Sequence, residues 1–504
     1  MFGGEEVTIT PGMRRYIEKN NQYLAERDRY IREVVKKWKF DTIAVHGLYT
    51  VKDAIEDYQG AIIEPVFMSS SQAYRDSDEM AAALAYLIPT WCYSRIANPS
   101  TYYYEWTLAL LEGYGFDGET SCCSTSSGMA AVMTAVQPFL VHKRRHVHEP
   151  RNFLATAQCY GGTFQQFSVR LMEERDIECR WVVDPTNLDE WASKIDENTR
   201  FLYGELPSNP GQGFFDIKAV ADLAHSHNLP LICDSTVASP ALLRPICYGA
   251  DIVVQSATKS LTTSGFGVCG AVIARKNLVC NIDNEELKRD FALYVKYLPN
   301  RDYGPNLHPM QAILTLNDMR TLRSKMDMLS RNTMKVAEYL EKHPAIDSVQ
   351  YLGLPNHPLH ELASRYMWLV DAEYDDQYRR PVNRYGHLMS FCVKGGPEAA
   401  RKFFDGLQRI WRATDLGRIK SVATIPAIST HQQQGQAGRC LAKIPANMVR
   451  LCVGGEHPDD IIADLDQALH RLTSKTKTAS TSQSRRNKPP EPAAARRLSR
   501  ARRR

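Results

Sequence analysis

Short apolar segments alternate with helical patterns over the middle of the chain, and this alternation restricts the possible folds more than any other feature. Helical patterns occur at Met129–Phe139, Leu188–Lys194 and Ile217–His227. Six segments between or beside them read as strands: FLATA (153–157), CRWVV (179–183), RFLYGEL (200–206), PLICDS (230–235), DIVVQSA (251–257) and CGAVIAR (269–275). Strands separated by helices predict an α/β fold with a mostly parallel sheet. In such sheets the ligand binds beyond the carboxyl ends of the strands.

The segments on either side of this region have different patterns. Residues 11–40 read as helix with many charges, and prolines interrupt residues 41–100. From about residue 306 a long helical stretch, Pro309–Lys342, precedes short strands and helices. We therefore expect four parts: a helical and extended arm at 1–97, a large domain at 98–305, a smaller C-terminal α/β domain at 306–472, and a tail at 473–504.

The formal net charge of +5 combines two parts of opposite sign. Residues 473–504 hold eleven Lys or Arg and one acid, so they carry +10 and leave the other 472 residues at −5. The tail is rich in Ser, Thr, Pro and Ala and cannot bury a core, which predicts disorder. It is suited either to weak contact with nucleic acid or anionic lipid, or only to keeping the chain in solution.

Cysteine and histidine usage argues against a disulfide scaffold and against a metal centre. The twelve cysteines show no C-x-x-C spacing, which predicts a reducing compartment, the cytoplasm. His225 and His227 are near neighbours, but histidines at a polar helix end are more often solvated than metal-bound. No apolar run approaches the roughly 18 residues needed to span a membrane, and the first residues do not read as a secretory signal.

Two strand ends carry groups that suggest chemistry. Asp234 ends one predicted strand, and Lys259 follows the next strand along the chain. Ser126, Ser127 and Gly128 stand just before a helical pattern, where free backbone N–H groups and the helix dipole favour a phosphate. The alternative reading of this Ser-Ser-Gly segment is a simple helix cap.

An aspartate, a lysine and a phosphate cradle together suit pyridoxal 5′-phosphate (PLP). A lysine forms a Schiff base with the cofactor aldehyde, and an aspartate keeps the pyridine nitrogen protonated, so that the ring withdraws electrons. Ser256 and Thr258 flank Lys259 and offer hydroxyl contacts to the phosphate. Burial in an apolar pocket would also lower the pKa of a free lysine and favour its nucleophilic form.

The chain resembles the PLP-dependent enzymes of cysteine and methionine metabolism, the trans-sulfuration family. DIVVQSATK (251–259) resembles the family pattern around the lysine. Six further segments resemble family motifs in the family's order: YSRIANPS (93–100), SSGMAA (126–131), YGGTF (160–164), ELPSNP (205–210), DSTVASP (234–240) and VRLCVGGE (449–456). The resemblance runs from about residue 40 to 472. It implies the PLP-dependent transferase fold of type I, with a mostly parallel sheet in the large domain and a smaller C-terminal domain.

The resemblance also implies a role for each matching residue. Lys259 would bind the cofactor and move protons, Asp234 would pair with the pyridine nitrogen, and Tyr160 would stack on the ring. The remaining cofactor contacts would be Ser127, Gly128, Met129, Asn209, Ser256 and Thr258. Arg450 would bind the substrate carboxylate in a bidentate manner, with help from Ser421. Tyr93 and Arg95 would reach the phosphate of a neighbouring subunit, which implies a dimer or tetramer acting on an amino-acid substrate.

The sequence is most similar to the O-acetylhomoserine sulfhydrylase and cystathionine γ-synthase branch. Similar segments include GGTFQQF (161–167) and IPAISTHQQ (425–433). This predicts a γ-replacement on an activated homoserine with a sulfur nucleophile, in methionine biosynthesis. The alternative is a C–S lyase of the cystathionine or methionine γ-lyase type. Methionine γ-lyases typically carry a cysteine where this chain has Gly162. A non-enzymatic role is disfavoured because Asp234 and Lys259 are both intact.

Overall fold

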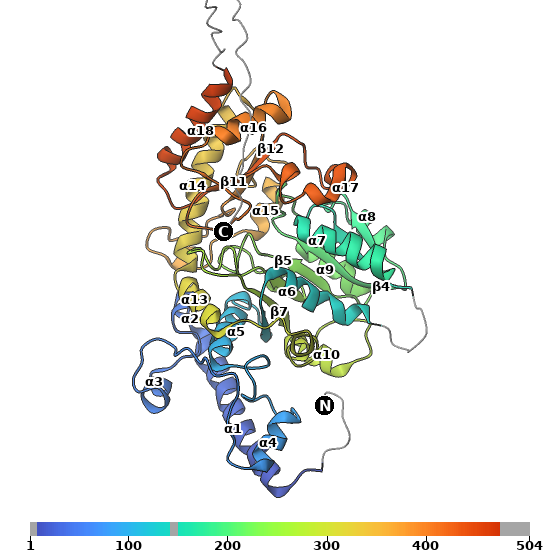
Figure 1. Ribbon diagram of the computed structural model, residues 1–504, viewed down its shortest axis with the longest axis vertical. Coiled ribbons are helices and arrows are strands. Elements are labelled where there is room, and N and C mark those ends of the chain that lie inside the picture. Colours follow the sequence, from blue (N-terminus) through green and yellow to red (C-terminus); the bar gives the residue numbers. More distant parts are fainter. Residues whose placement is uncertain (1–7, 142–149, 474–504) are drawn as a thin grey trace, which may run out of the picture.

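The computed structural model describes residues 8–141 and 150–473, which form two β-sheets and the helices around them (Figure 1). The predicted tail at 473–504 lies outside the described residues except for Thr473, which is the last residue of a helix. Within the described ranges no helix has both the length and the apolarity needed to cross a membrane. The two sheets are described in turn, because their junction positions the site.

The larger sheet has seven strands in the order β1-β7-β6-β5-β4-β2-β3. The strands are β1 (Thr120–Thr125), β2 (Asn152–Thr156), β3 (Glu178–Val182), β4 (Thr199–Glu205), β5 (Leu231–Asp234), β6 (Ile252–Gln255) and β7 (Gly270–Arg275). Only β7 runs antiparallel to its neighbours. All six predicted strands are confirmed. The prediction missed β1, because TSCCST lacks the apolar residues that mark a buried strand.

Both faces of the larger sheet are buried, which explains the nearly continuous apolar character of its strands. Within β6, Val253 belongs to one core while Ile252 and Val254 belong to the other. The covering helices are α5 (Pro99–Glu112), α6 (Gly128–Val136), α7 (Gly161–Gln165), α8 (Leu188–Ser193), α9 (Ile217–Ser226), α10 (Glu285–Arg289), α11 (Phe291–Val295) and α12 (Arg301–Tyr303). The predicted helices at 129, 188 and 217 are therefore confirmed.

The smaller sheet has five strands in the order β10-β11-β12-β9-β8. Its strands are β8 (Ile346–Gln350), β9 (Leu388–Val393), β10 (Trp411–Arg412), β11 (Val422–Thr424) and β12 (Met448–Cys452). The helices that follow β9 in the chain are α16 (Gly396–Gly406), α17 (Gly435–Leu441) and α18 (Pro458–Thr473), whereas α15 (His360–Tyr366), between β8 and β9, packs in the core of the larger sheet through Ala363 and Tyr366. A separate apolar core joins these strands to α14, α16 and α18. The arrangement agrees with the predicted second α/β unit.

Two helices connect the sheets. The sequence pattern had predicted one long helical stretch, Pro309–Lys342, in their place. The two helices are α13 (Pro309–Met319), which packs on α5, and α14 (Leu322–Lys342), which packs on β8 and α18. The predicted boundary at 306 stays a prediction, because α13 and the first half of α14 pack in the core of the larger sheet and only the second half of α14 packs in the core of the smaller sheet.

The N-terminal arm contains four helices, of which α1 and α4 lie at the end of the molecule opposite α16 and α18, while α2 lies beside α5 (Figure 1). They are α1 (Pro11–Glu33), α2 (Phe40–His46), α3 (Val51–Asp57) and α4 (Ser77–Leu84). The single helix expected over 11–40 is wrong at its end: α1 stops at Glu33 and a short 3₁₀ turn follows. Trp38 and Lys39 then adopt extended backbone angles, which separates α1 from α2.

Candidate active site

A cavity of about 510 Å³, which we call the Lys259 cavity, is lined by residues of both sheets. Glu205 and Asp234 are the last residues of β4 and β5, and Lys259 follows β6. Arg450 reaches the same cavity from β12 of the smaller sheet. Because β4, β5 and β6 are parallel neighbours, their carboxyl ends lie at one edge. The sheet topology thus brings together residues that are far apart in the sequence.

Asp234 is a buried carboxyl group with few donors around it. The backbone N–H of Thr236 donates to its Oδ1 at 3.0 Å, and the hydroxyl of Tyr203 donates to its Oδ2 at 3.4 Å. Burial raises the pKa of Asp234, and these hydrogen bonds act in the other direction. A buried carboxylate of this kind is stabilised by a cationic partner.

Glu205 lies beside Asp234 in the β4–β5 register. It accepts the backbone N–H of Tyr160 at 2.7 Å and that of Asn209 at 2.7 Å. Burial raises the pKa of Glu205 well above its usual range, and the charge of Asp234 raises it further. Glu205 therefore fixes the backbone of two residues that the sequence assigned to the cofactor.

The amine of Lys259 forms an ion pair in this cavity. Its Nζ donates to Oδ1 of Asp415 at 2.7 Å, and the guanidinium of Arg418 contacts the other oxygen of Asp415. Burial alone would raise the pKa of Asp415, but Lys259 and Arg418 outweigh it and hold that pKa below its usual range. The three side chains form a chain of alternating charges.

The Ser127–Gly128 segment forms the N-terminus of α6, as predicted. Ser127 caps the helix by accepting the backbone N–H of Ala130 at 3.1 Å. A Cβ at Gly128 would lie 2.4 Å from Cβ of Ser256, so only glycine allows this close approach. Ser127, Gly128, Met129 and Ser256 all line the cavity. Free N–H groups at a helix start together with a nearby hydroxyl are typical of an anion site.

Thr258 also lines the cavity, but its hydroxyl already has two partners. It donates to the carbonyl of Cys269 at 2.9 Å and accepts that residue's N–H at 3.0 Å. A hydroxyl has a single proton to donate. Thr258 would have to give up its bond to Cys269 before it could donate to a phosphate.

Arg450 is fully buried and contacts no carboxylate in the part of the chain that the structure describes. It donates to Oδ1 of Asn209 at 3.2 Å and to the carbonyls of Thr414 and Asp415 at 2.9 and 2.7 Å. Its Nε has no hydrogen-bond partner among the described residues. Burial lowers the pKa of Arg450 to about 10. A desolvated guanidinium with an unused donor is a site for an anion.

Tyr160 lines the cavity with a ring that is partly exposed to solvent. Ser421 does not line the cavity. Its hydroxyl donates to Glu456 at 2.8 Å and accepts the N–H of Gly454 at 2.9 Å. Ser421 therefore supports the loop after β12, and its predicted contact with the substrate stays a prediction.

Tyr93 and Arg95 lie outside the Lys259 cavity of their own chain. The guanidinium carbon of Arg95 is 5.4 Å from the centre of the Tyr93 ring, and Arg95 also donates to the carbonyl of Arg301. The Tyr93 ring is exposed. Their predicted contact with a neighbouring subunit stays a prediction.

Sequence reasoning missed several residues that shape this cavity. Glu205 is the first residue of the ELPSNP motif, and its position at the end of a predicted strand could have placed it beside Asp234. Asp415 and Arg418 lie in the loop between β10 and β11, where no spacing marks them. His225, weighed as a metal ligand, instead lies 2.8 Å from the carboxylate of Asp251.

Comparison with known proteins agrees with this geometry. Residues 41–470 match the family model described as Cys/Met metabolism PLP-dependent enzyme. The chain is 34% identical to L-methionine gamma-lyase of Porphyromonas gingivalis over 86% of this chain and 97% of the relative. It is 32% identical to O-succinylhomoserine sulfhydrylase of Pseudomonas aeruginosa over 86% and 96% of the two chains.

A solved structure supports the same conclusion. It is a putative O-acetylhomoserine (thiol)-lyase from Campylobacter jejuni, described with N′-pyridoxyl-lysine-5′-monophosphate. It superimposes with a TM-score of 0.75 at 30% identity and covers 86% of this chain and 100% of the other. The fold is accordingly that of the type I PLP-dependent enzymes, and the cofactor is PLP. The chain belongs to the family of PLP-dependent enzymes of cysteine and methionine metabolism.

Proposed function

We propose that the chain is a transferase that replaces the γ-substituent of O-acetyl- or O-succinylhomoserine with a sulfur nucleophile, forming homocysteine or cystathionine. The observation that carries this choice is the packing at Gly162. A Cβ there would lie 2.5 Å from Cε1 of Tyr160 and 3.2 Å from Sδ of Met129. The cysteine typical of methionine γ-lyases would therefore displace the Tyr160 ring, which counts against a methionine γ-lyase and supports the replacement reaction to that extent.

The residues of the Lys259 cavity fit PLP. The cradle at Gly128 and Ser256 suits the phosphate, and Asp234 suits a protonated ring nitrogen. Tyr160 offers a ring face, and Asn209 lies between Glu205 and Arg450, where it can contact a ring oxygen. When bound, the cofactor supplies an aldehyde for amines and a ring that withdraws electrons.

The side chains of this cavity would bind the substrate and transfer its protons. Arg450 would bind the substrate carboxylate through its unused Nε, which fixes the substrate in one orientation. Lys259 Nζ, held at the cavity wall by Asp415, would take the proton from the substrate Cα and return protons later in the reaction. The Cγ–O bond would break, acetate or succinate would leave with the ester oxygen, and a thiol could then form the new bond to Cγ.

The active assembly in this proposal is an oligomer, a dimer or a tetramer. The exposed Tyr93 ring and Arg95, which are absent from their own chain's cavity, support sites shared between subunits. We also propose a cytoplasmic location, which is supported by twelve cysteines that are all free. A weak contact of the basic tail with nucleic acid stays a proposal from composition.

The test is a substrate panel with the purified PLP-loaded enzyme. O-acetylhomoserine or O-succinylhomoserine is supplied with sulfide or cysteine, and homocysteine or cystathionine is measured. In parallel, methionine and cystathionine are supplied alone and 2-oxobutyrate is measured. We expect replacement to be at least about ten times faster, a difference of about 1.4 kcal/mol in activation free energy. Faster release of 2-oxobutyrate would instead assign the chain to the C–S lyases.

A further inference from the structure

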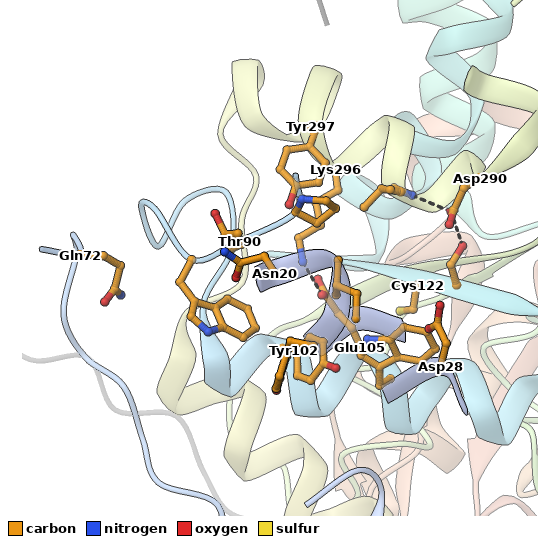
Figure 2. Close-up of a pocket in the computed structure, with 18 of the residues that line it drawn as sticks. Asn20, Asp28, Gln72, Thr90, Tyr102, Glu105, Cys122, Asp290, Lys296 and Tyr297 are labelled. Atoms are coloured by element: carbon orange, nitrogen blue, oxygen red, sulfur yellow. Dashed lines mark hydrogen bonds and ion pairs between the residues drawn. The ribbon is translucent and has the colours of Figure 1, made fainter. Parts of the chain in front are cut away.

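A second cavity of about 380 Å³ lies between α1 and the larger sheet, and Figure 2 shows side chains around it. We call it the α1 cavity. Its walls come from α1, residues 72–91, α5, β1 and the segment around α11. It shares no lining residue with the Lys259 cavity. The family match begins at residue 41, so α1 comes from a part of the chain that the match does not cover.

The face of α1 that lines this cavity has an unusual composition. Its residues are Tyr16, Asn20, Tyr23, Leu24 and Asp28, which recur at helical spacing on one side. A helix that packs on a core normally presents an aliphatic stripe. Here the inward side carries two phenols, an amide and a carboxylate. This face is suited to a polar or cationic ligand more than to an apolar core.

Aromatic rings form a corner of the cavity. The Trp91 and Tyr102 rings have centres 5.2 Å apart and planes at 82°, and the Tyr102 and Trp106 rings have centres 6.2 Å apart and planes at 66°. All three rings line the cavity. Rings set at steep angles to one another are the walls that proteins use to hold organic cations, since each ring face carries negative charge density.

The two lysines of the cavity are already neutralised. Lys296 donates to Glu105 at 2.5 Å, and both side chains are buried (Figure 2). Lys276 donates to Glu119 at 2.8 Å. Neither ammonium is therefore available to an anionic ligand without breaking an ion pair.

The carboxylates of the cavity, in contrast, outnumber its ammonium groups: Asp28, Glu79, Glu105 and Asp290 line it together with Lys276 and Lys296. Asp28 and Asp290 form no ion pair with any described residue, although both interact with Lys276 at longer range, and Asp290 accepts hydrogen bonds from Ser121 at 2.6 Å and from the N–H of Leu293 at 3.1 Å. The hydroxyls of Tyr74 and Thr90 line the same cavity and have no partner among the described residues. The cavity thus combines excess negative charge with unused polar groups.

We propose that the α1 cavity binds a small organic cation, with an ammonium or sulfonium group carried on an apolar body. The cationic group would lie beside Asp28 and against the rings of Trp91, Tyr102 and Trp106, and the apolar body would contact the remaining wall of the cavity. A volume of about 380 Å³ is within the range of small-molecule sites, roughly 300–1,000 Å³. The site is separate from the proposed catalytic reaction.

The experiment is calorimetric titration of the PLP-loaded enzyme with choline and with its uncharged carbon analogue, in which a tert-butyl group replaces the trimethylammonium. We expect one saturable site per chain and choline binding at least about ten times more tightly than the analogue. The visible spectrum of the cofactor should not change over the titration. Equal binding of the analogue, no saturation, or a spectral change that follows choline occupancy would overturn the proposal.

Matched variants locate the site. Asp28→Asn preserves the side chain's shape and should weaken choline binding about fivefold or more while leaving the analogue unaffected. Trp106→Leu should weaken both ligands. The controls are Glu26→Gln, an exposed carboxylate on the same helix, and Trp411→Leu on β10, and both should bind as the unmodified enzyme does. If Trp106→Leu does not fold, Asp28→Asn decides, and unchanged affinity in that variant contradicts the assignment.

Discussion

The Lys259 cavity and the α1 cavity are similar in size, about 510 and 380 Å³, but their charged groups are arranged differently. In the Lys259 cavity, among residues 8–141 and 150–473, no carboxylate contacts the buried guanidinium of Arg450 and no cation pairs with Asp234. In the α1 cavity both lysines are paired and the spare charge is negative. Uncompensated buried charge costs stability and is retained where a ligand supplies the partner.

The two cavities also differ in how the fold produces them. Parallel strand ends create the first, so its residues come from short segments spread over the family match. A helix outside that match closes the second. We therefore expect changes in the Lys259 cavity to affect turnover, and changes around the α1 cavity to affect stability.

The largest effect is expected for Lys259→Ala. Turnover should fall at least about a thousandfold, because the variant lacks the amine to which we assign cofactor binding and proton transfer. The visible absorption of the lysine-bound cofactor should disappear. Thermal stability should change little, because Asp415 keeps its contact with Arg418. Lys402→Ala, an exposed lysine on α16, is the control. Turnover within tenfold of the unmodified enzyme would remove Lys259 from its assigned role.

Glu105→Gln tests the expectation that changes around the α1 cavity affect stability more than turnover. It leaves Lys296 buried without its partner, so the free energy of unfolding should fall by about 3 kcal/mol or more. Turnover per folded molecule should stay within about twofold. Urea unfolding measures the first quantity and a saturated assay the second. The control is Glu398→Gln, an exposed carboxylate on α16. A loss below about 1 kcal/mol would show that the pair is not a stabilising contact.

Arg450→Lys should have a smaller effect, concentrated in substrate binding. The charge remains but the planar fork is lost, so we expect kcat/KM to fall about a hundredfold, mainly through KM. Steady-state kinetics with the amino-acid substrate measures this, with the exposed Arg409→Lys as control. An unchanged KM with a reduced kcat would argue that Arg450 does not hold the ground-state carboxylate.

The smallest expected effect is a pH dependence of the free energy of unfolding that comes from His387, a buried residue in contact with Ser260. His387 is fully buried between Ser260, 2.9 Å from its Nε2, and Cys452, 3.2 Å from its Nδ1. Burial, and then the charge of Arg450, lower the pKa of His387 from 6.5 to about 4. The unfolded chain binds a proton below about pH 6.5 and the folded chain does not, so unfolding free energy falls as pH drops from 6.5 towards 4.

The upper limit of this contribution is about 3 kcal/mol. The pH dependence of unfolding should therefore be shallower for His387→Asn over that interval, even though the variant is less stable overall. His457→Asn, at an exposed position, should keep the slope of the unmodified chain. Equal slopes for both variants would exclude His387 as the titrating group.

Much of the large domain was predictable because its signals are local. Each buried strand is a short apolar run, and Ser127 begins a helix through a hydrogen bond three residues away. The sequence also predicted that Asp234 and Lys259 would lie at the same cavity, because neighbouring strands of a parallel sheet end at one edge. The contacts of Ser421 and Thr258 were not predictable, because their hydroxyl partners, Glu456 and Cys269, are decided by loop packing.

The sequence by itself determined the order of strands and helices, the family, and the choice of Lys259, Asp234 and Arg450 as candidate site residues, which line one cavity. These depend on residue type and short-range spacing. Only the tertiary structure decided that Asp415 holds Lys259 and that Arg450 has no carboxylate in contact. It also decided that α1 covers a second cavity. Such contacts join segments separated by up to several hundred residues, and they arise only when the chain packs.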